Sequence, residues 1–234
     1  MKARRMPLWL GWTLALLVAA GFARLGFWQL ARMHEKEAML DRAKAVLRDR
    51  TPMPLADAET PMVWVEGSGT FERPVLLLDN QIREERAGVS VYCILHVGVA
   101  NDRLVDLGWL PIAADRTMPD VQCPTGKHVV RGLLTLPPST GLQMGRSVLF
   151  LKNSTFLMTR VDVDSIIDAT YARIPPVVLR LDPSMKGIGY ARDLDVLPNT
   201  LPPSRHLGYA VQWFALAAAV LATAGVLTFR KPRA

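Results

Sequence analysis

The sequence predicts a membrane protein of the α+β class, in which two transmembrane helices flank an antiparallel, β-rich extracytoplasmic domain with one or two helices of its own. Two long apolar runs, residues 8–30 and 207–229, predict the transmembrane helices. Between them, short runs rich in β-branched residues alternate with Gly, Pro and Asn, which indicates strands with antiparallel neighbours. The expected domains are therefore a span at 8–30, a folded domain at 31–205 and a second span at 207–229.

The net charge of +7 lies at the two ends of the chain. Every Asp and Glu lies between residues 31 and 205, where basic residues balance them, and the excess basic residues are Lys2, Arg4, Arg5, Arg24, Arg230, Lys231 and Arg233. A nucleic-acid-binding protein needs excess positive charge on a folded face, so we expect no nucleic-acid partner. Basic flanks beside both spans predict cytoplasmic termini and an extracytoplasmic middle domain. No Arg/Ser-rich transit peptide precedes the first span, which favours a bacterial plasma (inner) membrane, with the lipid bilayer as a partner.

The first apolar run has two interpretations. Residues 1–20 resemble a secretory signal peptide with a cleavage site after Ala20. The apolar run continues past that site, however, and Trp28 suits an aromatic anchor at the outer interface. Arg24 lies one turn deeper, where a long side chain can reach the interface by snorkelling. We therefore expect an uncleaved helix that crosses a hydrocarbon core of about 30 Å.

The middle domain is expected to begin as a helix and to continue as short strands. Residues 32–50 place apolar side chains at helical spacing among charged ones, so the first span should continue as a solvated helix that Thr51-Pro52 ends. Strands are expected at 63–67, 70–71, 75–78, 89–99, 103–112, 128–136, 148–152 and 177–181, and a helix capped by Asp162 or Asp164 at 161–171. Together they predict a small β-barrel or curved sheet, followed by a non-helical approach to the second span at 197–203.

The middle domain offers little sign of catalytic chemistry, and we expect no enzyme. Motifs of hydrolases, phosphate-binding loops and zinc proteases do not occur in the sequence. Cys93 lies in an apolar strand, so a buried free thiol is the favoured interpretation; a disulfide with Cys123, or a copper or redox site, are the alternatives. His34, His96 and His128 have no ligand-type spacing and are expected to be structural or on the surface.

The outer ends of the two spans carry the candidate functional residues. On a helix, His206 and Trp213 share one face of the second segment, and Tyr209 lies beside them. In the first segment, Arg24, Trp28 and Arg32 are four residues apart and also share a face. If the spans pack together, a flat amphipathic ligand would find stacking surfaces, an imidazole for iron and cations for its carboxylates. An ordinary aromatic belt with a polar helix cap is the alternative interpretation.

These terminal segments resemble the Surfeit-locus-one family. Residues 25–32, Leu-Gly-Phe-Trp-Gln-Leu-Ala-Arg, followed by Lys36, are similar to the Gly-x-Trp-Gln-x-x-Arg-x-x-x-Lys pattern that closes the family's first span. Residues 197–199 and 206–214 are similar to its second-span signature, and the segments around Val65, Leu77 and Leu107 resemble its middle motifs more weakly. One departure is Leu107, because the family usually carries Arg before this Gly-Trp pair.

The resemblance implies a non-enzymatic assembly factor for a haem–copper cytochrome c oxidase, which aids haem a insertion or stabilises the catalytic subunit. It implies haem a as a transient cofactor, His206 as the haem contact, and the catalytic subunit and the haem a synthesis machinery as partners. Trp28, Gln29, Arg32, Tyr209 and Trp213 lie in the matching motifs, and their cofactor-binding roles are our inference. The alternatives are a partner that stabilises an oxidase subunit without haem, and a membrane-anchored periplasmic enzyme or thiol–copper protein.

Overall fold

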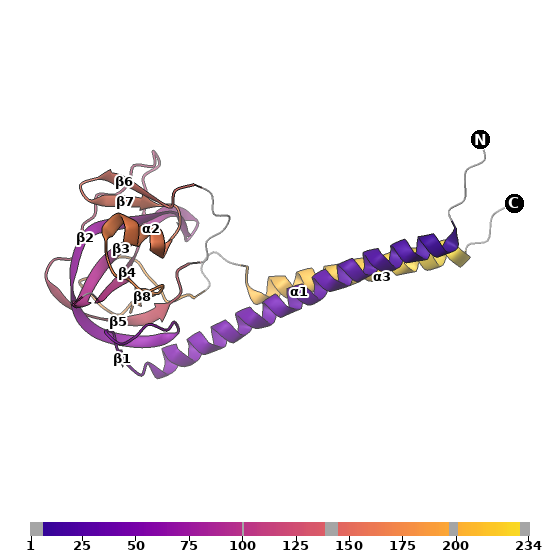
Figure 1. Cartoon of the computed structure of the whole chain (residues 1–234), viewed down its shortest axis with the longest axis horizontal. Helices are drawn as coiled ribbons and strands as arrows, with labels where there is room; N and C mark the ends of the chain where they lie inside the picture. Colours follow the sequence, from indigo (N-terminus) through magenta and orange to yellow (C-terminus); the bar gives the residue numbers. More distant parts are fainter. Residues whose placement is uncertain (1–6, 100, 139–144, 197–200, 230–234) are drawn as a thin grey trace. The chain divides into compact units, whose positions relative to one another are not determined.

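The computed structural model describes residues 7–99, 101–138, 145–196 and 201–229, and the chain divides into two compact units. Met1–Asp41 and Thr200–Ala234 form one unit, which holds two long helices. Arg42–Asn199 form the other, which holds the strands (Figure 1). The predicted α+β class, with two apolar helices around a β-rich domain, is therefore confirmed. The limits of the spans relative to a bilayer stay predictions.

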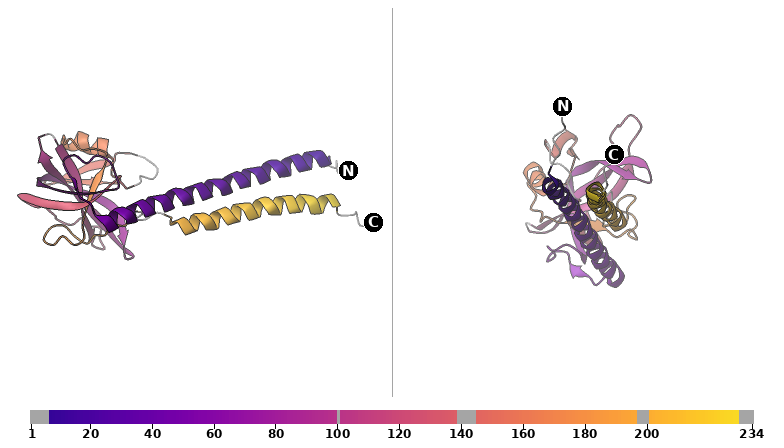
Figure 2. Two further views of the ribbon diagram at one scale, coloured as in Figure 1. Left: turned by 90° about the horizontal axis from the view of Figure 1, so that it is seen from below. Right: turned by 90° about the vertical axis from the view of Figure 1, so that its right-hand side faces the viewer.

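The first unit is a pair of antiparallel helices, α1 (Leu8–Asp49) and α3 (Pro203–Phe229), shown side by side in Figure 2. Both are long and apolar enough to cross a membrane. The indole N–H of Trp12 donates to the Thr228 hydroxyl at 3.1 Å, and Lys36 Nζ donates to the Leu201 carbonyl at 2.7 Å. α1 continues past its apolar part and ends before Thr51-Pro52, as predicted. The basic flanks, and residues 197–200 of the expected non-helical approach, lie outside the described residues.

Five strands of the second unit close into a barrel, as the sequence predicted. In ring order they are β2 (Val63–Arg83), β3 (Arg86–Gly98), β4 (Asn101–Pro111), β8 (Val178–Leu181) and β5 (Lys127–Thr135). The ring closes because β2 pairs with both β3 and β5. The sheet is mixed, since β4 and β8 are parallel whereas the other neighbours in the ring are antiparallel. The expected antiparallel neighbours are therefore found at four of the five junctions of the ring.

The three short strands expected at 63–67, 70–71 and 75–78 form the single strand β2. Its first part pairs with β5 and its second part with β3. Gly69 permits the close approach at the change of partner, because a Cβ there would lie 2.4 Å from the His96 carbonyl oxygen. Register shifts along the β3 side mark bulges, which bend a strand without ending it.

Smaller elements extend the barrel. β1 (Met53–Pro54) pairs in parallel with β2, and the hairpin of β6 (Val148–Lys152) and β7 (Thr155–Met158) joins β2 through a parallel β7. α2 (Val163–Thr170) begins after Asp162, one of the two predicted caps. The Asp162 carboxylate accepts hydrogen bonds from the Ser165 and Ser147 hydroxyls, which lower its pKa. β7 was not predicted.

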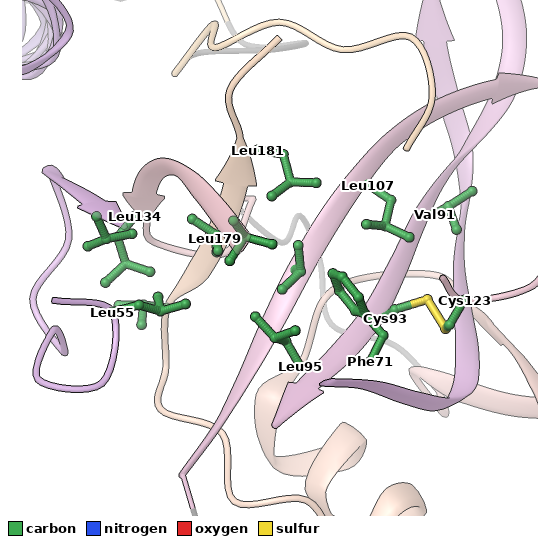
Figure 3. Close-up of a cluster of buried hydrophobic side chains, with 14 of the residues drawn as sticks. Leu55, Phe71, Val91, Cys93, Leu95, Leu107, Cys123, Leu134, Leu179 and Leu181 are labelled. Atoms are coloured by element: carbon green, nitrogen blue, oxygen red, sulfur yellow. A yellow bond between two sulfur atoms is a disulfide. The ribbon is translucent and has the colours of Figure 1, made fainter. Parts of the chain in front are cut away.

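Alternate side chains along the strands fill two separate cores. The barrel interior, shown in Figure 3, includes Leu55, Phe71, Val91, Cys93, Leu95, Leu107, Cys123, Leu134, Leu179 and Leu181. The second core lies on the outer face of the sheet beneath α2 and includes Leu76, Leu78, Tyr92, Ile94, Leu104, Met158, Ile166 and Val178. Each strand with residues in both cores is therefore apolar on both faces.

Cys93 and Cys123 form a disulfide in the barrel core, with their Cα atoms 5.9 Å apart (Figure 3). The favoured prediction of a buried free thiol is therefore wrong, and so is a thiol–copper site, because each sulfur is bonded to the other. Cys93 is buried, as predicted. Its apolar strand environment suits a thiol and a disulfide equally well, so the sequence did not distinguish them.

A buried carboxylate joins the end of α1 to the barrel. Asp182 lies after β8 and contacts Arg131 at 3.0 Å and Arg50 at 3.5 Å, and it accepts the Ser184 N–H at 2.9 Å. Burial raises the pKa of Asp182, but these hydrogen bonds and the Arg50 charge outweigh it, so the net pKa lies below the usual range. The Arg50 guanidinium also lies 4.8 Å from the centre of the Trp64 ring.

Candidate ligand site on the helix pair

The contact between the two helices contains a hydrogen-bonded histidine. His206 lies in the first turn of α3, and its Nδ1 is 2.7 Å from Oε1 of Gln29 on α1. An amide oxygen only accepts, so Nδ1 carries the proton and donates it. The neutral imidazole therefore keeps its lone pair on Nε2.

Nε2 of His206 has no hydrogen-bond partner among the described residues, although it is buried. The whole residue is only 7 % exposed. A buried polar atom without a partner costs free energy, which in native proteins often marks a functional site. A neutral imidazole whose second nitrogen is fixed by a hydrogen bond is the form that ligates metal ions. The chemistry of this donor therefore fits a haem iron.

Aromatic rings line the same contact further along the helices. Phe22 of α1 stacks on Trp213 of α3, with ring centres 5.6 Å apart and planes at 29°. Gly26 lets Phe214 approach α1, because a Cβ at this glycine would lie 2.7 Å from the ring. Phe27 packs edge-on against the same ring at 5.2 Å. A small residue that admits a neighbouring side chain is typical of packed membrane helices.

The structure separates the remaining predicted site residues from this contact. Arg24, Trp28, Arg32 and Tyr209 are all exposed. Arg32 pairs with Glu35 at 2.7 Å, and its guanidinium lies 5.9 Å from the Trp28 ring. Of the predicted set, Gln29, His206 and Trp213 thus lie along the helix contact, whereas the other four lie on exposed faces.

Gln29 was predicted as a site residue from the sequence, but Phe22 and Gly26, which lie on the same face of α1, were not. Phe22, Gly26 and Gln29 are spaced four and three residues apart, so they share one face of a helix. That spacing was the available signal. The face with Arg24, Trp28 and Arg32 was predicted instead, because these residues are also spaced four apart and so share one side of a helix.

The barrel histidines offer no comparable free nitrogen. His96 lies between two carboxylates: its Nε2 is 3.1 Å from Glu72, and its Nδ1 contacts Asp102. Asp102 is buried and accepts the Arg173 N–H at 2.7 Å, which fixes it in place. Among the described residues, no group of three His, Cys, Asp or Glu side chains lies close enough together to hold a metal ion. His96 is thus held between Glu72 of β2 and Asp102 of β4.

Leu107, where the family usually carries Arg, lies in the barrel core and is buried. Gly108 follows with φ +110°, in the region that favours glycine, and a Cβ there would lie 2.8 Å from the Ala191 carbonyl. The Trp109 N–H donates to Ala191 at 2.7 Å, and its indole N–H donates to the Gln81 carbonyl at 3.0 Å. In this chain the motif therefore fastens the segment after β8 to β4.

Comparison with known proteins agrees with the resemblance of the terminal motifs. A sequence model of the SURF1 family matches residues 16–218, which include the barrel, His206 and Gln29. A search of curated proteins found no match to the chain. Because the family match covers most of the sequence, the chain belongs to the SURF1 family, a family of cytochrome oxidase assembly factors.

Proposed function

We propose that this chain assists the assembly of a haem–copper cytochrome c oxidase by presenting His206 to haem a on its way to the catalytic subunit. The observation that carries the proposal is the state of the imidazole: Nδ1 is held by Gln29, and Nε2 is buried without a partner among the described residues. Haem a supplies an iron centre that accepts a nitrogen lone pair. Nε2 is the atom of this chain that would donate one.

The residues around His206 have separable tasks in this proposal. Gln29 accepts the Nδ1 proton and thereby sets both the tautomer and the direction of the ring. The paired rings of Phe22 and Trp213 offer flat apolar surface along the same helix contact. The apolar helices exclude water from the imidazole, which keeps the neutral form favoured over the charged one.

Two observations support placing the barrel outside the cytoplasm of a bacterial plasma membrane. The antiparallel pairing of α1 with α3 places the start of α1 beside the end of α3, where Trp12 donates to Thr228. The Cys93–Cys123 disulfide suits an oxidising compartment such as the periplasm. Together they favour cytoplasmic termini and a periplasmic barrel.

Two buried or half-buried polar groups beside β4 and β8 have structural partners. Asp106 accepts the Gly108 N–H at 2.9 Å, and burial raises its pKa although nearby Arg180 lowers it. The Arg192 guanidinium donates to backbone carbonyls, including Ile188 at 2.8 Å. These groups complete the fold of the β4 and β8 region.

The test compares His206→Ala with His34→Ala in full-length protein purified from cells that make haem a. His34 is exposed on α1 and lies 3.3 Å from Glu37, so its removal leaves the helix contact intact. We expect the haem absorbance band of the protein to fall at least tenfold in His206→Ala and to persist in His34→Ala. Oxidase assembly should fall in parallel.

Unchanged haem content in His206→Ala, with the Cys93–Cys123 disulfide intact, would overturn the proposal. A wild-type protein that never carries haem, yet is required for oxidase assembly, would favour the alternative of a partner that stabilises a subunit without haem.

A further inference from the structure

The β6–β7 hairpin exposes apolar side chains that the two cores do not use. Three consecutive residues of β6 are exposed: Leu149 by 43 %, Phe150 by 65 % and Leu151 by 40 %. Figure 1 shows the hairpin at the margin of the barrel. Contiguous exposed apolar residues on a domain surface commonly mark an interaction site.

One edge of β6 is open. β7 lies between β2 and β6, and no other described strand pairs with β6. Among the described residues, its outer backbone N–H and C=O groups therefore have no strand partner, and such groups can pair with a further strand. Natural sheets usually protect such an edge with charges or prolines, whereas the middle of β6 carries Leu, Phe and Leu.

The two faces of the hairpin are both apolar. Phe150 packs edge-on against Phe156, with ring centres 5.4 Å apart, and Phe156 together with Val148 belongs to the face that α2 covers. Leu149 pairs with Leu157 and alternates with Phe150, so it points to the opposite face, and Leu151 lies at a register irregularity between Phe150 and Lys152. A strand added at β6 would meet apolar side chains above and below the sheet.

The exposed charges at the two ends of β6 are both basic. Arg146 and Lys152, at the two ends of the strand, are exposed, and no Asp or Glu occurs between Asp120 and Asp162. The Asp162 carboxylate also lies near the start of β6, but it is half-buried, accepts from Ser147 and pairs with Arg160 at 3.5 Å. The next exposed acids, Asp164 and Asp168, lie on α2, on the other side of Val148 and Phe156. The ends of β6 therefore favour a segment that carries negative charge.

We propose that β6 is the docking edge for an extended segment of a partner protein, apolar in its middle and acidic at its ends, which continues the sheet by strand addition. A second copy of this chain fits poorly, because its Arg146 and Lys152 would face those of the first copy or extend the positive surface. A bilayer fits poorly as well, since hydrocarbon leaves the open backbone groups of a sheet edge unsatisfied. The docking edge is independent of the haem proposal.

The experiment places a photo-reactive benzoylphenylalanine at position 150 of the full-length chain, in membranes of cells that make the oxidase. A matched control carries the same group at Val129, which is 63 % exposed on β5. Mass spectrometry then identifies the cross-linked segment. We expect an apolar segment with flanking acids from another protein, captured at position 150 and not at 129.

Charge reversal sharpens the test. Lys152→Glu should reduce the yield of this cross-link several-fold, whereas Lys186→Glu, at an exposed position after β8, should leave it unchanged. If the protein with the substituted position 150 does not accumulate, the same group at Leu149 serves under the same criteria, with the Cys93–Cys123 disulfide as the check of folding.

Several results would overturn the proposal. These are cross-links only to lipid or to a second copy, a captured segment without acids, equal capture at 129 and 150, or no capture at all.

Discussion

The barrel closes around side chains from five strands, a disulfide and a buried carboxylate, whereas the helix pair meets through a few aromatic contacts and polar bonds. In the barrel, buried polar groups such as Asp182 have several partners. In the helix pair, the buried Nε2 of His206 has none among the described residues. The barrel unit also has buried atoms without a hydrogen bond, such as Nε of Arg103, but the other nitrogens of that guanidinium donate to backbone carbonyls. Nε2 of His206 differs because it is the lone-pair atom of a neutral imidazole.

This difference is physically reasonable for a protein that holds a ligand for a limited time. Regions that must open for binding and release are drawn from the less stable parts of a structure. A ligand atom held deep in the barrel would require the main core to open, which costs a large share of the folding free energy. Substitutions in the barrel should therefore lower its free energy of unfolding, whereas substitutions in the helix pair should change ligand binding and helix spacing.

The largest effect is expected from removing the disulfide. Cys93→Ser with Cys123→Ser releases a link between positions 30 residues apart, which should lower the free energy of unfolding of the barrel by about 3 kcal/mol. Denaturant titration of the full chain, followed by near-ultraviolet circular dichroism, measures the change. The His206 tautomer should be unaffected; a change there would show that the two units are coupled.

A smaller loss of barrel stability is expected from Asp182→Asn, at about 2 kcal/mol near neutral pH, because hydrogen bonds between charged groups are lost. Asp120→Asn, at an exposed position, is the control. The pKa of Asp182 lies below its ordinary value in the folded state, so its contribution is complete at neutral pH and is lost as pH falls through that lowered pKa. In Asp182→Asn, the free energy of unfolding should lack this loss at low pH. If it falls with pH as steeply as in the wild type, Asp182 is not the group responsible.

The third effect concerns Gln29. Gln29→Leu removes the acceptor of the His206 Nδ1 proton, and haem affinity should fall about tenfold, as for other groups that orient a metal ligand. Nitrogen NMR of the haem-free protein provides a separate readout, since the Nδ1-protonated tautomer should lose its dominance. Gln212→Leu, at an exposed position of α3, is the matched control. An unchanged tautomer in Gln29→Leu would disprove the positioning role.

The smallest effect is expected from Gly26→Ala. The added methyl would meet the Phe214 ring, so the helices should separate slightly at a cost of about 1 kcal/mol. Gly21→Ala is the control on the same helix, because a Cβ there meets nothing within 4 Å. Distances between spin labels at Leu14 and Val226 measure the separation. Identical distances in the two variants would show that Gly26 does not set the helix spacing.

The sequence predicted the parts of the fold that depend on local pattern. The apolar runs, the α1 extension, the α2 cap at Asp162 and most strands follow from periodicity and turn residues. β7 was missed because its turn is unusual: Asn153 and Ser154 both adopt positive φ, and serine is a weak signal for that conformation. The single strand β2 was split because Gly67 and Gly69 look like turn residues, although they serve close packing.

The sequence predicted several residues of the candidate site but not the contacts between them. His206, Gln29 and Trp213 were named from the sequence, but the bond between His206 and Gln29 depends on how the helices rotate about their axes. That rotation depends on contacts between residues far apart in the sequence, such as the close approach of Phe214 to Gly26. The sequence did not decide whether Cys93 and Cys123 form a disulfide for a similar reason, because pairing depends on the distance between the two residues in the folded chain.

The strand β2 sets a limit on how this domain can vary in evolution. It pairs with β1, β3, β5 and β7, so one inserted or deleted residue would shift the register against every neighbour beyond the change and turn inward side chains outward. The long connection between β4 and β5 has no strand register to keep, and its fixed points are Cys123, the Arg116–Asp79 pair and the Met118 and Val121 side chains that pack on the barrel core. Length differences among related chains should therefore collect in that connection, while the length of β2 stays constant.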